Sequence, residues 1–337
     1  MTEAATTERT PGSWRQLALA LAAFLLLPLI PIVRSIVPIE QTLMLIVPVV
    51  AICALFGWKL GGRPGLAAIW LALAVWMLAQ HAGPPGTPYD MMARGWVLLL
   101  AASFGVVTLW SAATPFFVRA MAAIAIAAAV AFSIALASPG GIDRVKHAAG
   151  DELTRRSGES IEALQQLSAS PTWVGWSAKS PSLDEVAERS EAQLRAVPEH
   201  AASLLPALLA LESLAALAIA WALYHRLSPV RVGPPLGPLK EFRFNDQLVW
   251  GLAVGATLCL LPPFVEGKVA GLNLLLFFGA LYLTRGLGVM AWMSRGRILL
   301  VVVVLMALLA PPILGALAIG LGLGDTWLDW RRKVRTT

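Results

Sequence analysis

The chain has 337 residues, of which 58% are hydrophobic and 14% charged, and its 26 Lys and Arg against 20 Asp and Glu give a net charge of +6. Soluble domains contain about a quarter charged residues, so this composition excludes an ordinary soluble domain and predicts a membrane protein. Cys53 and Cys259 both fall within apolar runs, which favours packing roles over a disulfide or a metal site.

Nine apolar runs predict membrane spans, because a helix needs about 20 apolar residues to cross the roughly 30 Å hydrocarbon core. The first run is too long for a signal peptide and has no cleavage site after it, so we expect it to be retained. The sequence therefore predicts an all-α fold, a polytopic transmembrane helix bundle with a small helical extracytoplasmic insertion. Its eight or nine spans cover residues 17–33, 42–58, 64–81, 95–111, 115–137, 202–224, 247–264, 270–291 and 298–322.

The short loops between these runs predict the orientation, because Lys and Arg concentrate on the cytoplasmic side of a membrane. With a cytoplasmic N-terminus, the inner loops hold eleven Lys and Arg, whereas the short outer loops hold only Arg34, Arg94 and Lys268. This bias predicts a multi-pass membrane protein with a cytoplasmic N-terminus and with the acidic insertion 139–200 on the outer face. Several tryptophans near the ends of the expected spans support the boundaries, namely Trp14, Trp58, Trp96, Trp110, Trp221, Trp250 and Trp292.

The last apolar run leaves two arrangements open. A ninth full span would place the basic ending DTWLDWRRKVRTT on the outer face. Pro311 and Pro312 interrupt the run, however, and each half rises only about 20 Å, so the halves are also compatible with a broken hairpin that returns the tail to the cytoplasm. The basic charge of the tail favours the second arrangement.

Three regions follow from this pattern: residues 1–138 with about five spans, the extracytoplasmic insertion 139–200, and the C-terminal transmembrane region 201–337. The insertion contains 10 of the 20 acidic and 7 of the 26 basic residues, so its net charge is -3 and that of the remainder is +9. The remaining positive charge lies in short loops, where anionic lipid headgroups are the natural partners and nucleic acid is not expected.

Apolar spacing in the insertion predicts two amphipathic helices joined by a loop that exposes Trp173 and Trp176. The insertion is either a lid or partner-docking element, or a tolerated expansion of a loop. The apolar faces consist of Ile161, Leu164 and Leu167 in the first helix, and Leu183, Val186, Leu194 and Val197 in the second.

Polar side chains inside spans are costly, which makes Glu212, Arg285 and Asn273 a candidate intramembrane polar site. A pair between Glu212 and Arg285 would let both stay charged and bind a charged solute or relay a proton. The alternatives are a neutral, hydrogen-bonded Glu212 and an Arg285 that reaches the headgroups. For Asn273 we expect an interhelical hydrogen bond. Asn245 and Asp246 precede an expected span and are typical of helix capping.

Glycine spacing indicates two places where helices pack closely, because GxxxG motifs let backbones approach. Gly251 and Gly255 form one motif, and Gly320 and Gly324 form the other.

No motif of catalysis is present in the sequence. It contains neither GxxxxGK[ST], HExxH nor GxSxG, and His81, His147, His200 and His225 are scattered. We therefore expect no catalytic, cofactor-binding or metal-ligating residues, no cofactor and no enzyme activity.

Four stretches within residues 202–333 resemble the DUF2232 (YybS-like) family of bacterial membrane proteins. The ordered ending of paired prolines, Gly-Asp, aromatic and basic residues is the most specific of them, and the N-terminal half matches only in its hydropathy. The stretches read LLPALLALESLAALAIAWALYHRL, PLKEFRFNDQLVWGLAV, GLNLLLFFGALYLTRGLGVMAWM and APPILGALAIGLGLGDTWLDWRRK.

This family is distantly similar to the substrate-binding subunits of energy-coupling-factor (ECF) transporters and to the rod-shape protein MreD. The resemblance implies an uncharacterised membrane protein and supplies no site residues. The first function it suggests is capture of a small solute, with separate ATPase and coupling subunits as partners. The alternative is a non-enzymatic scaffold that holds envelope-assembly proteins.

Overall fold

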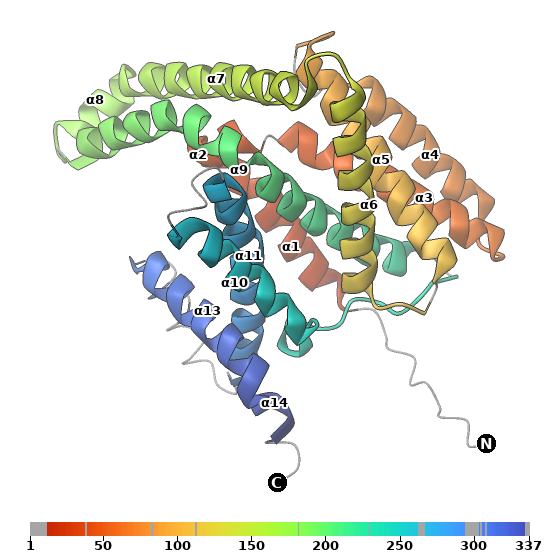
Figure 1. Cartoon of the computed structure of the whole chain (residues 1–337). Helices are drawn as coiled ribbons and strands as arrows, with labels where there is room; N and C mark the ends of the chain where they lie inside the picture. The colour runs from red at the N-terminus through yellow and green to blue at the C-terminus, as the bar shows by residue number, and fades with distance from the viewer. Residues whose placement is uncertain are drawn as a thin grey trace. The chain divides into compact units, whose positions relative to one another are not determined.

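The computed structural model describes residues 12–37, 39–81, 84–111, 113–180, 182–228, 230–261, 267–293 and 309–333, together with 303, 305 and 306. Within these residues every regular element is a helix (Figure 1). Six helices are long and apolar enough to cross a membrane, and three shorter apolar helices cover Trp14–Leu29, Pro64–Ala79 and Asp246–Leu260. The all-α polytopic fold is therefore confirmed.

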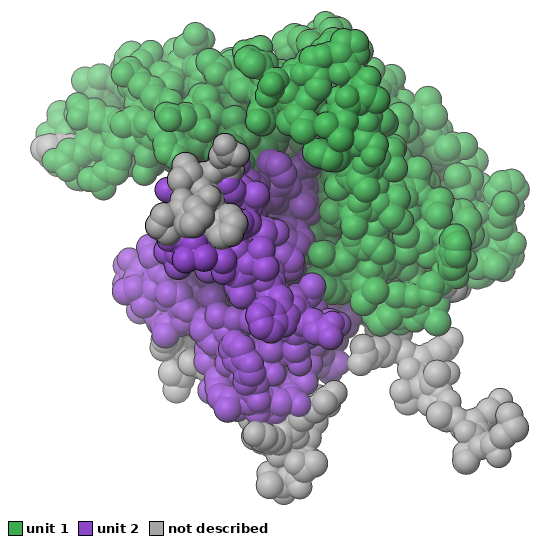
Figure 2. Space-filling view, in the orientation of Figure 1, with its two compact units in different colours: residues 1–205, 212–236 green, residues 206–211, 237–337 purple. Residues whose placement is uncertain are grey.

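The chain divides into two compact units (Figure 2). Unit 1 comprises Met1–Leu205 and Glu212–Leu236, and unit 2 comprises Pro206–Leu211 and Gly237–Thr337. The described helices before residue 182 belong to unit 1: α1 (Trp14–Leu26), η1 (Leu27–Leu29), α2 (Pro31–Ile36), α3 (Ile39–Lys59), α4 (Pro64–Ala79), α5 (Pro88–Trp110), α6 (Phe116–Ala137), α7 (Gly141–Ser168) and α8 (Pro171–Ser177).

Local sequence signals explain where several of these helices begin. Pro64 and Pro88 stand at the first helical positions of α4 and α5, where the missing N–H costs nothing. Thr87 accepts a hydrogen bond from the amide of Asp90 and caps α5. Hydropathy alone indicated a span that begins at residue 95. The helix α5 begins seven residues earlier, at Pro88.

Helix α9 (Ser182–Leu227) is a single helix of 46 residues. At 1.5 Å per residue it is about 69 Å long, more than twice the thickness of the hydrocarbon core. Its first half therefore lies outside the membrane and continues into the span as part of the same helix. The boundary expected at residue 200 falls inside this helix. Helices α7 and α8 run beside the first half of α9 (Figure 1), where Gln165 of α7 donates to Glu191 at 3.0 Å.

Small and aromatic side chains form the core of unit 1. Ala120, Ala123 and Ala127 of α6 are fully buried, together with Leu100 and Phe104 of α5. Small residues let the two helices approach closely, which membrane proteins need because lipid provides no hydrophobic driving force between helices.

Two of the tryptophans expected at span ends have a different role. Trp221 is completely buried and packs edge-on against Phe104, with ring centroids 5.7 Å apart. Trp96 lies well inside α5 because that helix starts earlier than expected. By contrast, Trp58 and Trp110 are exposed at the ends of their helices, as predicted for the interface.

The described part of unit 2 after residue 236 contains three apolar helices and three short helical segments. Pro311 stands at the start of α13, so the break expected before the paired prolines is confirmed, whereas most of residues 298–310 lie outside the described part of the chain. The elements are η2 (Leu239–Glu241), η3 (Asp246–Leu248), α10 (Val249–Leu260), α11 (Lys268–Met293), α13 (Pro311–Leu328) and α14 (Trp330–Lys333).

Glycines set the spacing of the helices in unit 2. A Cβ added at Gly255 of α10 would lie 3.0 Å from the carbonyl oxygen of Gly271 in α11, which confirms close packing at the first GxxxG motif. Gly320 of the second motif has open space beside it. The tight contact of α13 is made instead by Gly322, whose added Cβ would collide with the carbonyl oxygen of Tyr282 in α11.

Candidate functional site

Glu212 is the centre of a polar cluster in unit 1. It lies on α9 with 7% of its surface exposed, and its two carboxylate oxygens accept hydrogen bonds from the start of α3. Gln41 donates through Nε2 at 3.3 Å, and Thr42 donates through Oγ1 at 3.2 Å. Since Gln41 and Thr42 occupy the first turn of α3, the cluster lies near one end of that span.

Tyr89, the second residue of α5, orients this cluster. Its hydroxyl donates to Gln41 Oε1 at 2.7 Å, and the Gln41 amide therefore points its nitrogen at Glu212. Further along α5, Trp96 Nε1 donates to the hydroxyl of Ser213, the neighbour of Glu212, at 3.0 Å. Three helices thus close around one carboxylate through neutral groups.

Helix α7 contributes a second layer next to Tyr89. The guanidinium carbon of Arg156 lies 4.8 Å from the centroid of the Tyr89 ring. Arg156 also donates to the buried Glu152 at 2.8 Å, and Glu152 pairs with Arg155 at 2.6 Å. Arg155 pairs in turn with Glu159. These two acids and two arginines pair with one another.

Glu212 has no ion-pair partner among the residues that the structure describes. Keeping an isolated charge in an apolar interior is expensive, and proteins usually retain one for binding or transfer. The hydroxyls, the amide and the carboxylate gathered here are the groups that bind small polar or cationic molecules.

The Glu152 ion pairs make the stability of unit 1 depend on pH. Burial raises the pKa of Glu152, but hydrogen bonds from Arg155 and Arg156 and their charges lower it more, so its pKa lies below the ordinary 4.5. A lowered folded-state pKa means that the stabilisation is complete above the unfolded-state pKa and is lost as the pH falls through the folded-state value.

We expect Glu152→Gln to destabilise the protein by about 1.5–3 kcal/mol at neutral pH, the usual contribution of hydrogen bonds to a charged group. The difference in melting temperature between wild type and variant should shrink as the pH falls below 4.5 and through the lowered pKa of the wild-type carboxylate, which then becomes protonated. Thermal unfolding of both proteins in detergent at several pH values measures this difference in melting temperature. A difference that stays constant over the whole range would contradict the assignment.

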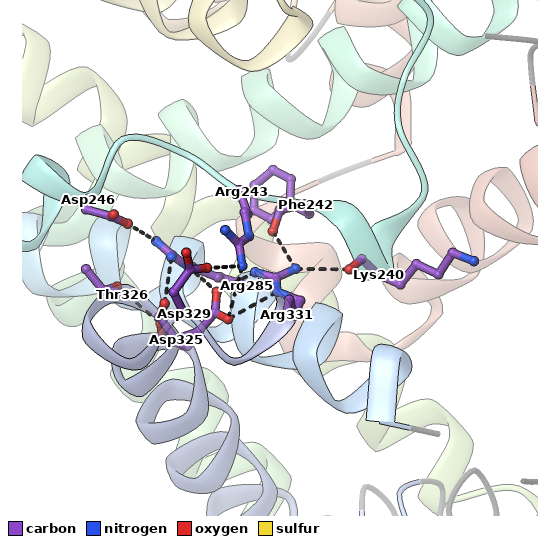
Figure 3. Close-up of polar contacts among 10 residues, drawn as sticks. Lys240, Phe242, Arg243, Asp246, Arg285, Asp325, Thr326, Asp329 and Arg331 are labelled. Atoms are coloured by element: carbon purple, nitrogen blue, oxygen red, sulfur yellow. Dashed lines mark hydrogen bonds and ion pairs between the residues drawn. The ribbon is translucent and has the colours of Figure 1, made fainter. Parts of the chain in front are cut away.

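Unit 2 contains a different cluster, centred on the completely buried Asp325 near the end of α13 (Figure 3). Arg285 of α11, which is 2% exposed, donates to Asp325 Oδ2 at 3.0 Å and to its backbone oxygen at 3.2 Å. The same guanidinium pairs with Asp246 at 2.7 Å. Arg331 of α14 contacts both carboxylate oxygens of Asp325, at 3.2 and 2.5 Å.

The Asp325 cluster also fixes the loop between α9 and α10. Arg331 Nη1 donates to the backbone oxygens of Lys240 at 3.0 Å and Phe242 at 3.1 Å (Figure 3). Arg243 pairs with Asp329 at 2.5 Å and lies 3.7 Å from Asp325. Three arginines therefore face three aspartates, and this balance identifies the cluster as a structural clamp rather than a site that needs a ligand.

The clamp places the end of the chain next to residues 239–243. Because Arg331 bonds to Lys240 and Phe242, α14 lies on the same side of the membrane as that loop.

Asn273 makes the helix contact that the sequence indicated. Its Oδ1 accepts from the backbone amide of Ala207 at 2.9 Å, and its Nδ2 donates to Val269 within its own helix. Ala207 follows Pro206, which lacks an amide N–H and interrupts the hydrogen bonding of α9 at this point. Asn273 therefore has a structural role in unit 2.

Comparison with known proteins identifies the family. The family model described as a predicted membrane protein (DUF2232) matches residues 18–326, nearly the whole chain. The chain belongs to the DUF2232 family. No match was found among curated proteins or among solved structures.

In this DUF2232 protein the three residues singled out from the sequence do not form one site. Glu212 lies in unit 1, whereas Arg285 and Asn273 lie in unit 2, and each has partners within its own unit. Hydropathy indicated them because each is polar inside an apolar run. Hydropathy gave no signal for Gln41, Thr42 and Tyr89, the polar residues gathered at Glu212. They stand near helix starts, where polar residues are ordinary.

Proposed function

We propose that this DUF2232 protein is the solute-binding membrane subunit of a transporter in the bacterial inner membrane, and that the solute binds at Glu212. The observation that carries the proposal is the buried carboxylate, held by neutral groups from α3 and without an ion-pair partner in the described part of the chain. The distant resemblance of the family to ECF substrate-binding subunits supports the same role.

The groups around Glu212 suggest the chemistry of the solute. A carboxylate, the Gln41 amide, and the Thr42 and Tyr89 hydroxyls favour a small molecule with a protonated amine or several hydrogen-bond donors. An acidic solute would meet the negative charge of Glu212 and be disfavoured.

Transport by this protein would require other subunits. The sequence has no GxxxxGK[ST] motif, so we propose that a separate ATPase and a coupling membrane subunit supply the energy, and that the protein is not itself an enzyme. We also propose a cytoplasmic N-terminus. This places the hairpin that α7, α8 and the first half of α9 form on the extracytoplasmic side.

A second candidate function is a scaffold for envelope-assembly proteins. The observation that favours it is the hairpin itself, whose distal end leaves Val174 and Trp176 more than half exposed. A scaffold requires such a surface but requires no solute at Glu212.

Affinity purification from native membranes in mild detergent distinguishes the two functions. We expect wild type and Glu212→Gln to recover the same ATPase and coupling subunits, since Glu212 is buried within this chain. The variant should nevertheless fail to restore the growth that the wild-type gene restores to a strain lacking it. Glu162→Gln, the same change at an exposed position of α7, serves as the control and should leave both unchanged.

Recovery of envelope-assembly proteins without an ATPase would contradict the transport proposal. Full complementation by Glu212→Gln would contradict the assignment of the site.

A further inference from the structure

The hairpin formed by α7, α8 and the first half of α9 changes character along its length. Toward the membrane its apolar side chains are buried: Leu153 of α7 is 2% exposed and Leu194 of α9 is completely buried. At the distal end the apolar side chains are exposed instead: Leu167 at 53%, Val174 at 55%, Trp176 at 58% and Val186 at 55%. The apolar faces expected from the sequence are therefore buried at the base and open at the tip.

The tip is an ordered surface rather than a loose loop. Ser170 caps α8 by accepting from the amide of Trp173 at 3.2 Å, and the indole of Trp173 donates to Asp184 of α9 at 3.1 Å. Together with the bond between Gln165 and Glu191, this fixes the register of the two long helices. The exposed apolar side chains come from the end of α7, from α8 and from the start of α9, and exposed apolar side chains gathered at one end of a hairpin are typical of an interaction site.

The acidic residues around the exposed apolar side chains indicate what kind of partner binds there. Glu159 and Glu191 are paired with Arg155 and Arg195. The residues between them, 160–190, contain four acids and two basic residues, a net charge of -2 at the distal end of the hairpin. An anionic lipid surface would repel it. A second copy of the chain would present the same negative tip, and like charges at an interface oppose association.

We propose that the hairpin tip docks a segment of another protein that presents apolar side chains bordered by Lys and Arg. Trp176 and Val174 supply the apolar contact, and Glu185 and Glu188, both exposed on α9, supply the charge complement. The partner lies on the side of the membrane to which the hairpin projects. This surface is separate from the Glu212 cluster, so the inference does not depend on the proposed solute.

Photo-cross-linking of the full-length protein in native cells tests this inference. p-Benzoylphenylalanine placed at position 176 should form an adduct with another protein, and the cross-linked peptide should carry Lys or Arg beside apolar residues. The same probe at position 146, an exposed lysine at the base of α7, should not give this adduct. Adding Glu185→Lys and Glu188→Lys to the position-176 probe should lower the adduct yield about five-fold.

Four results would overturn the inference. They are adducts with lipid alone, adducts between two copies of the chain, equal adducts from positions 176 and 146, and a protein adduct whose yield does not respond to the charge reversal. Both reversed residues are exposed, so the comparison is made at equal accumulation of the protein, checked by immunoblotting.

Discussion

Asp325→Ala is expected to destabilise the DUF2232 protein by about 3–5 kcal/mol, the usual cost of removing one partner from a buried ion pair. Asp325 is completely buried and is shared by Arg285 and Arg331, which are themselves 2% and 5% exposed. Its removal leaves two guanidinium groups in an interior that hydrates them poorly. The loop that Arg331 holds through Lys240 and Phe242 would lose its anchor as well.

Unfolding by titration with SDS in mixed micelles measures this loss. Asp143→Ala is the control, because the Asp143 side chain is 82% exposed and pairs only with Lys146 at 3.8 Å, so its loss should cost less than about 1 kcal/mol. A double-mutant cycle with Arg285→Ala should give a coupling energy of about 1–3 kcal/mol. Additive effects of the two substitutions would show that the pair does not stabilise the fold.

The second large effect is expected from Gly286→Ala on α11. A Cβ at Gly286 would collide with the backbone oxygen of Ala318 on α13, and this oxygen cannot move without shifting the whole helix. Overpacking of this kind costs about 1–3 kcal/mol. Helix propensity alone predicts the opposite sign, a gain of about 1 kcal/mol for Gly to Ala.

Gly279→Ala on the same helix is the matched control for Gly286→Ala. No atom lies within 4 Å of a Cβ added at Gly279, so only the propensity gain should appear. The same SDS titration compares both variants with wild type. Equal stabilisation by the two substitutions would show that α11 and α13 are not in the close contact described.

The sequence was sufficient to predict the fold class, because apolar runs long enough to cross a bilayer leave few alternatives to helices. It could not predict the length of α9. Hydropathy marks where a helix enters the apolar core but not where a helix that has left the membrane ends. The same limit explains α5, because its first turn, which carries Tyr89, is too polar for hydropathy to indicate a span there.

Burial cost identified Glu212, Arg285 and Asn273 as special residues but did not identify their partners. Pairing Glu212 with Arg285 is the simplest charge balance within one sequence, yet the structure gives Arg285 two aspartates and gives Glu212 only neutral donors. Asp246 was interpreted as a capping residue. Asn245 provides that cap, by accepting from the amide of Gln247, and this leaves Asp246 for Arg285.

The most direct test of solute binding at Glu212 is mass spectrometry of small molecules released from the purified protein. Wild type and Glu162→Gln, purified in mild detergent from native membranes, should release one polar or cationic compound in near-equal amount to protein. Glu212→Gln, folded to the same extent, should release at least about ten-fold less, because it loses the carboxylate. An equal yield from Glu212→Gln, or no compound from wild type, would contradict a solute site at Glu212.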